Sequence, residues 1–157
     1  MVFPTLRYPT KQQTLIWLRR RQKDRPSEIA KDLKLSRPFV SMEQKTAENR
    51  IKKLIEHTAS VNRVKIDRLS ARYGIAEGYC HAYDSPTYII FSPKIGVQNW
   101  YVHEGECGTC DLEAQCTETL RTLAEEWEIG IPPGMPPTEL GVYLFETIRR
   151  RLKWDKV

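Results

Sequence analysis

Three of the four cysteines in this chain lie close together in the sequence and could hold a metal centre. Cys107, Cys110 and Cys116 form a C-x2-C-x5-C run, and the only other cysteine is Cys80. Four thiolates are the ligand set of an iron–sulfur cluster or of a structural zinc site. The sequence therefore predicts one centre with Cys80, Cys107, Cys110 and Cys116 as its ligands.

Three chemical interpretations of these cysteines stay open. A [4Fe-4S] cluster is favoured, because zinc sites more often consist of two paired CxxC or CxxH knuckles. A structural Zn2+ site is the alternative, in which His81 or His103 could replace one cysteine. Free or reversibly oxidised thiols are the third. In the first two, Cys116 would lie at the start of a helix, whose amide groups and dipole stabilise a thiolate.

The spacing of the run resembles that of the oxygen-responsive FNR regulators and of the WhiB proteins, which hold a [4Fe-4S] cluster. The remote cysteine precedes the run here, as in WhiB, whereas it follows the run in FNR. The resemblance covers the ligand spacing and not the surrounding sequence. It implies a cluster that senses redox state or iron.

An enzymatic use of the same cysteines has less support. Cys107 or Cys110 could act as a nucleophile with His81 or His103 as the base. The sequence has no glycine-rich phosphate loop, no HExxH and no serine-centred elbow. We therefore predict that the protein is not an enzyme.

The two halves of the chain differ sharply in charge. Residues 1–70 hold 17 lysines and arginines against 7 acidic residues, a net charge of +10, and residues 71–157 have a net charge of −5. Lysine and arginine at this density are typical of proteins that bind nucleic acid. Affinity for a polyanion is thus predicted for the N-terminal half.

Turn and capping signals divide the basic half into short helices. A first helix is predicted over 11–22, and a second begins after Asp24, with Pro26 in its first turn. A short turn at Lys34 and Leu35 leads to Ser36, which can cap a third helix whose apolar face contains Val40, Ala47, Ile51 and Leu54. Two short helices joined by a tight turn are the layout of the helix-turn-helix.

Polar side chains follow the start of the third helix on the face opposite Val40. Arginine pairs with guanine, glutamine with adenine, and serine and lysine with phosphates or base edges. Together with Lys34 in the turn, the residues predicted to contact double-stranded DNA are Arg37, Ser41, Gln44 and Lys45.

The same segment resembles a known family of regulators. The stretches PSEIAKDLKLSRPFVS (26–41) and EQKTAEN (43–49) are similar to the Tfx-type archaeal transcriptional regulators, which carry a sigma-factor-like helix-turn-helix. The similarity covers residues 12–56, about a third of the chain. It implies a transcriptional regulator and does not extend to the cysteines.

A long helix is predicted to follow, because residues 46–73 contain no proline or glycine and Gly74 could end the helix. Its apolar stripe could pack on the rest of the chain or on a second copy. We favour the second copy, and thus a homodimer, because dimers commonly bind two DNA half-sites.

The composition changes at Gly74, where residues prone to form strands begin. Two or three short antiparallel strands, then a helix over 117–127 and a last helix capped by Thr138, predict a small sheet with two helices. The fold class is α+β, with a DNA-binding domain at 1–73 and a cysteine-containing sensor domain at 74–157.

The overall expectation is a cytoplasmic transcriptional regulator. The sequence opens without a signal peptide, and its apolar stretches are too short to span a membrane. The alternatives are a DNA-binding regulator with a structural zinc site and an RNA-binding accessory protein.

Overall fold

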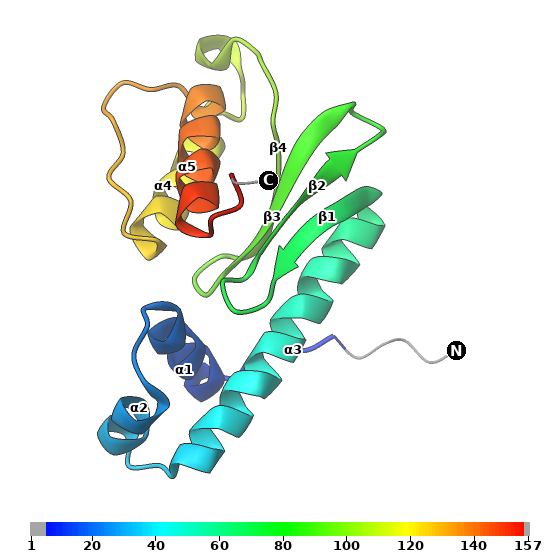
Figure 1. Cartoon of the computed structure of the whole chain (residues 1–157). Coiled ribbons are helices and arrows are strands. Elements are labelled where there is room, and N and C mark those ends of the chain that lie inside the picture. Colours follow the sequence, from blue (N-terminus) through cyan, green and yellow to red (C-terminus); the bar gives the residue numbers. More distant parts are fainter. Residues whose placement is uncertain (1–5, 156–157) are drawn as a thin grey trace.

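The computed structural model describes residues 6–155, which contain five α-helices and one four-stranded antiparallel sheet (Figure 1). Three helices come first, then the sheet, then two more helices. In chain order the elements are α1 Lys11–Arg21, α2 Pro26–Leu33, α3 Arg37–Val61, β1 Val64–Ser70, β2 Ile75–Cys80, β3 Ser85–Ser92, β4 Gly96–Tyr101, the short 3₁₀ turn η1 Cys107–Thr109, α4 Glu113–Glu126 and α5 Pro137–Arg151. The α+β class predicted from the sequence is confirmed.

Local capping fixes where the first helices begin. The Thr10 hydroxyl accepts a hydrogen bond from the Gln13 amide, and the Gln13 side chain accepts one from the Thr10 amide, which is a capping box at the start of α1. Ser36 caps α3 in the predicted way, through its hydroxyl and the amide of Phe39 at 3.2 Å. The predicted apolar face of α3 is buried, and Ile55 and Ala59 extend it.

The prediction of one helix reaching residue 73 was wrong, because α3 ends at Val61 and β1 follows at once. Arg63 adopts a left-handed backbone conformation with φ of 54°, which ends the helical path. Val64 and Ile66 then alternate with exposed Lys65 and Asp67, a pattern that suits a strand paired along one side.

Gly74 therefore has a different role from the predicted helix end. It lies in the turn between β1 and β2 with φ of 70°, and its amide donates to the carbonyl of Ser70 at 2.8 Å. A Cβ atom at this position would lie 2.6 Å from Cζ2 of Trp17. Glycine is thus required both by the backbone conformation and by the close approach of α1.

The sheet is a meander in the order β1-β2-β3-β4, and helices cover both of its faces (Figure 1). The C-terminal half of α3 and Trp17 of α1 pack on one face, against Ala76, Cys80, Ile89 and Phe91. Helices α4 and α5 pack on the other, against Ile75, Tyr88, Ile90 and Trp100. Neighbouring residues of one strand thus enter different cores.

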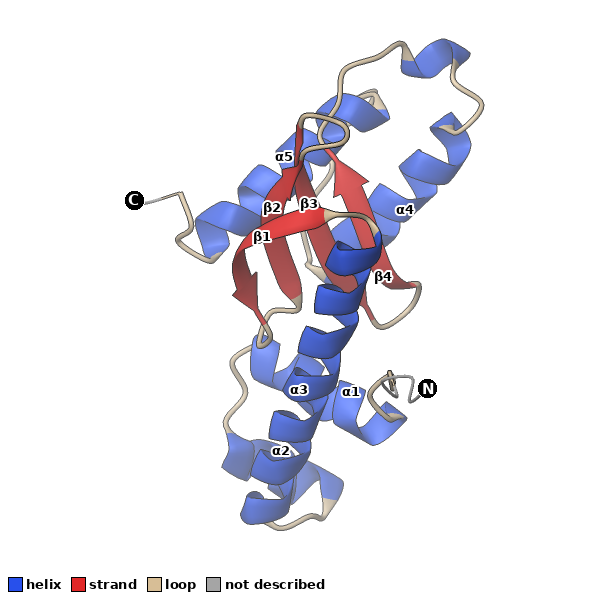
Figure 2. Cartoon of the chain, turned by 90° about the vertical axis from the view of Figure 1, so that its right-hand side faces the viewer, coloured by secondary structure: helices blue, strands red, loops and turns tan. Residues whose placement is uncertain are grey.

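Helix α3 connects the other two N-terminal helices to the sheet, as Figure 2 shows. Its apolar stripe is buried within the chain itself, on the sheet, and not left for a second copy. The prediction of a homodimer was based on an apolar stripe available to a second copy, and this stripe is not available. The division at residues 73 and 74 stays a prediction, although one core joins α1, α3 and the sheet across that position.

The helices described by the structure include none with the length and apolar character needed to cross a membrane.

Candidate functional site

The cysteine run forms a compact turn between β4 and α4. Cys107 begins η1, Cys110 follows it, and Cys116 lies in the first turn of α4. The amide of Cys110 donates to the carbonyl of Cys107 at 3.1 Å, and the amide of Cys116 donates to that of Leu112 at 2.9 Å. These hydrogen bonds fold the run back on itself, so its three cysteines are neighbours in space as well as in sequence.

The thiol of Cys116 lies in a less polar environment than its neighbours. Its side chain is partly buried and packs against the core under α4 and α5, whereas Cys110 is exposed. Burial raises the pKa of the Cys116 thiol above its usual value, and the nearby thiols of Cys110 and Cys107 raise it further. The direction of this shift is opposite to the stabilised thiolate that was predicted for Cys116.

Cys80 lies elsewhere. It is the last residue of β2, it is fully buried, and its side chain enters the core between the sheet and α3. Its Sγ atom donates to the carbonyl of Asn62 at 3.8 Å. Cys116 packs in the core on the opposite face of the sheet. The structure therefore brings together Cys107, Cys110 and Cys116, and it does not bring Cys80 to them.

The two histidines considered as substitute ligands are both exposed. His81 packs edge-on against Tyr79, and His103 places its Nδ1 atom 2.7 Å from the carbonyl of Tyr101. Over residues 6–155, no three side chains of His, Cys, Asp or Glu converge as a metal site requires. The three cysteines of the run share one turn, but their side chains are not gathered as a ligand set, and the complete four-cysteine set does not fit one metal or cluster here.

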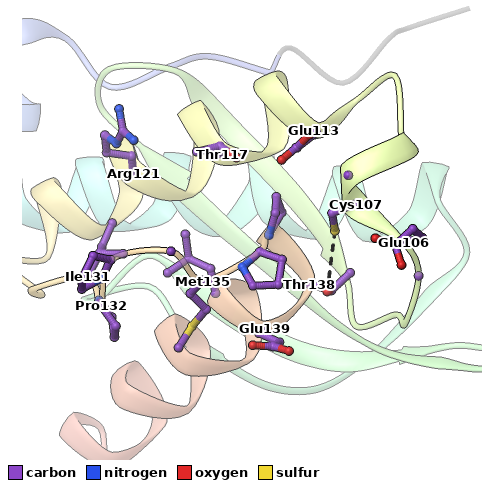
Figure 3. A pocket seen from close by; sticks show the side chains of 17 residues that line it. Glu106, Cys107, Glu113, Thr117, Arg121, Ile131, Pro132, Met135, Thr138 and Glu139 are labelled. Atoms are coloured by element: carbon purple, nitrogen blue, oxygen red, sulfur yellow. Dashed lines mark hydrogen bonds between the residues drawn. The ribbon is translucent and has the colours of Figure 1, made fainter.

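A pocket of about 840 Å³ opens beside Cys107, as Figure 3 shows. The segment from Ile131 to Pro136 forms one wall, and Glu113 and Arg121 of α4 line another. The Cys107 thiol donates to the Thr138 hydroxyl at 3.7 Å. The prediction that Thr138 caps α5 was wrong, because the helix begins one residue earlier, at Pro137.

No motif in the sequence indicated this pocket. The residues that line it come from η1, α4, the loop and the start of α5, which are consecutive in the chain, and the loop returns to η1 because α5 packs beside α4. A pocket built in this way leaves no local motif in the sequence.

The predicted DNA-contacting residues surround the turn between α2 and α3. Lys34 ends α2 in a left-handed conformation with φ of 57°, and the amide of Leu35 donates to the carbonyl of Ala30 at 2.9 Å. Leu35 packs against a small core of Ile16, Ile29, Ala30 and Val40. This core fixes the angle between the two helices and the direction of the first turns of α3.

Four of the predicted residues are free to meet a partner. The side chains of Lys34, Arg37, Ser41 and Lys45 are exposed. In the part of the chain that the structure describes, Lys34, Arg37 and Lys45 have no side-chain hydrogen bond or ion pair. By contrast, Arg19 pairs with Asp24 and Asp32 at 2.8 Å each, which raises its pKa.

Gln44 is less accessible than the other predicted residues. Its amide oxygen accepts from Nε of Arg20 at 3.0 Å, and its amide nitrogen donates to Glu48 at 3.1 Å. The side chain thus links α3 to α1 within the molecule. Contact between Gln44 and an adenine would require these two hydrogen bonds to break.

The candidate site therefore has two separate parts, an exposed basic surface around the start of α3 and a three-cysteine turn at the start of α4. Three arginines of the N-terminal half, Arg19, Arg20 and Arg21, are by contrast engaged in internal hydrogen bonds. Comparison of the chain with family models, with curated proteins and with solved structures finds no match.

Proposed function

We propose that the protein is a transcriptional regulator that binds double-stranded DNA with the surface around the start of α3. The observation that carries the proposal is the exposed, unpaired state of Lys34, Arg37 and Lys45 at the tight turn between α2 and α3. In a helix-turn-helix, the residues at the start of the second helix contact the bases of the major groove. Unpaired cations at this position meet the phosphates without breaking any internal ion pair.

The chemistry of each of these side chains suggests a different role in DNA binding. Arg37 can form two hydrogen bonds with one guanine, and we assign it to sequence recognition. Lys45, two turns further along α3, is a point charge suited to a phosphate. Gln44 has an internal role, since it holds α1 against α3.

We expect Arg37→Ala to weaken binding to a preferred duplex by about 1–3 kcal/mol and to relax its sequence preference. Lys45→Ala should weaken binding to all duplexes alike and reduce the salt slope by about one unit. The preferred sequence is first selected from a random duplex pool, and affinities are then measured by fluorescence anisotropy at several salt concentrations.

Lys65→Ala is the matched control, because Lys65 is exposed on β1 far from the turn. It should bind as the unaltered protein does. Unchanged affinity in both α3 variants would show that the DNA surface lies elsewhere. Equal affinity for single-stranded RNA would favour the alternative of an RNA-binding accessory protein.

We also propose that the three-cysteine turn is the sensing part of the regulator, with a [4Fe-4S] cluster as the first candidate and Zn2+ as the alternative. The position of Cys107, Cys110 and Cys116 in one turn, with Cys116 in the first turn of α4, supports it. The placement of Cys80 in a different core argues that it acts in packing and not as a ligand. We therefore assign the ligand role to the run alone.

Removal of single cysteines separates these two roles. Cys110→Ala should lower the iron or zinc content per chain without loss of stability, because this side chain is exposed. Cys80→Ala should leave the metal content unchanged and cost about 1 kcal/mol of unfolding free energy. Metal content is measured on protein purified without oxygen. Loss of metal in Cys80→Ala would contradict the assignment, and absence of metal from the unaltered protein would rule out the centre.

A further inference from the structure

The exposed basic face of α3 continues beyond Lys45. Lys52 is exposed, and within residues 6–155 its side chain has no hydrogen bond or ion pair. It follows Lys45 by seven residues, which is nearly two full turns of an α-helix. The two lysines therefore lie on one face of α3, about 10 Å apart along its axis. The next residue, Lys53, is rotated away from Lys52 by about 100°.

Four residues on this face form one row, which we call the α3 stripe. With 3.6 residues per turn, they fall within a sector of about 80° around the helix axis. Helix α3 runs without interruption from Arg37 to Val61, as Figure 2 shows, so the row is continuous and about 22 Å long. The α3 stripe consists of Arg37, Ser41, Lys45 and Lys52.

The neighbouring residues define where the α3 stripe ends. Glu56, one turn after Lys52, is exposed and reverses the charge. On the same side of the helix as Arg37, Ile55 and Ala59 are buried in the core with the sheet. Glu48 also lies on this face, but it is half-buried and accepts a hydrogen bond from the amide of Gln44 at 3.1 Å. The free basic surface of α3 thus ends where the sheet begins to cover the helix.

The length of the α3 stripe distinguishes two ways in which α3 could meet DNA. The major groove is about 12 Å wide and admits an α-helix. A helix that enters it with its first turn alone would hold Lys52 about 22 Å from the bases that Arg37 contacts, out of reach of the duplex. A helix that lies along the groove would keep Lys45 and Lys52 beside the phosphates of the groove wall. Two unpaired lysines on one face favour the second arrangement, because cations placed beside phosphates release counterions and strengthen binding.

We infer that α3 lies along the major groove and that Lys52 contacts a DNA phosphate. The inference rests on the proposed function and adds to it the orientation of α3 and the length of duplex that it covers. At about 3.4 Å per base pair, the distance from Arg37 to Lys52 corresponds to no more than about six or seven base pairs.

Fluorescence anisotropy with the selected duplex, at several salt concentrations, tests the contact of Lys52. Lys52→Ala should reduce the salt slope by about one unit, as Lys45→Ala does. Lys53→Ala is the matched control, because it removes the same charge from the adjacent exposed position outside the α3 stripe, and it should leave the slope unchanged.

The outcomes separate this inference from the proposed function. A normal slope in Lys52→Ala, with a reduced slope in Lys45→Ala, would overturn the inference and leave the proposed function standing. Equal slopes in Lys52→Ala and Lys53→Ala would show a diffuse effect of charge and also overturn it. Absence of duplex binding by the unaltered protein would overturn both.

Stepwise shortening of the selected duplex, by two base pairs at a time, tests the orientation of α3. Shortening from one end should abolish the loss of affinity caused by Lys52→Ala while the loss caused by Arg37→Ala persists, because the two contacts lie several base pairs apart. If both losses disappeared at the same length, α3 would meet the groove with its end alone, and the inference would be wrong.

Discussion

Replacement of Trp17 by alanine should lower the free energy of unfolding by about 3–5 kcal/mol, the largest effect that we expect from a single change. Trp17 is fully buried, and its ring meets that of Phe91 edge-on with 5.4 Å between their centres. Its Nε1 atom donates to the carbonyl of Ala71 at 3.0 Å. The change would leave a cavity between α1 and the sheet and an acceptor without its donor.

Urea denaturation followed by circular dichroism measures this loss. Leu15→Ala is the control on the same helix, because Leu15 is 43% exposed and the change should cost less than about 1 kcal/mol. Similar losses in the two variants would show that α1 is not anchored on the sheet by Trp17.

Replacement of Gly78 by alanine should cost about 2–3 kcal/mol through a different mechanism, overcrowding of the sheet. A Cβ atom at this position would lie 2.1 Å from the carbonyl oxygen of Lys65 in the neighbouring strand. Both atoms belong to rigid parts of the sheet, so β1 must move away from β2. The pairing is already irregular here, with a register shift between Ile66 and Arg68.

The loss is measured by urea denaturation, and hydrogen exchange of the β1 amides locates it. Gly105→Ala is the control, because a Cβ atom there would meet nothing within 4 Å. If both variants were equally stable, with unchanged exchange in β1, the close approach of the two strands would be wrong.

The sequence predicted the starts of α1 and α3 well because the signals there are local. Ser36 and Pro38 fixed the start of α3, and the spacing of Val40, Ala47 and Ile51 fixed its buried face. These signals depend on residues only a few positions apart, and distant contacts did not override them.

The end of α3 and the strand β1 were missed because absence of proline and glycine does not by itself continue a helix. Arg63 turns the chain into a left-handed conformation without a glycine, which is uncommon for such a residue. The alternation of Val64 and Ile66 with charged residues was present in the sequence, but its interpretation needed the pairing with β2.

The position of Cys80 could not be predicted because helices cover both faces of the sheet. Ala76 and Cys80 face α3, whereas Ile75 faces α4 and α5. When both faces are apolar, the pattern along a strand does not tell which face a given residue joins. The burial of Arg21 could not be predicted either. Arg21 follows two other arginines in the sequence, and only its contact with α4 distinguishes it from them.

The packing of α3 on the sheet has a consequence for how this protein could be divided or recombined. Ile55 and Ala59, near the end of the helix, belong to the same core as Ile89 and Phe91 of β3. A cut after residue 73 would expose that core on both fragments. The basic N-terminal helices are therefore not an interchangeable module, and a transfer of these helices to another protein would have to include the sheet.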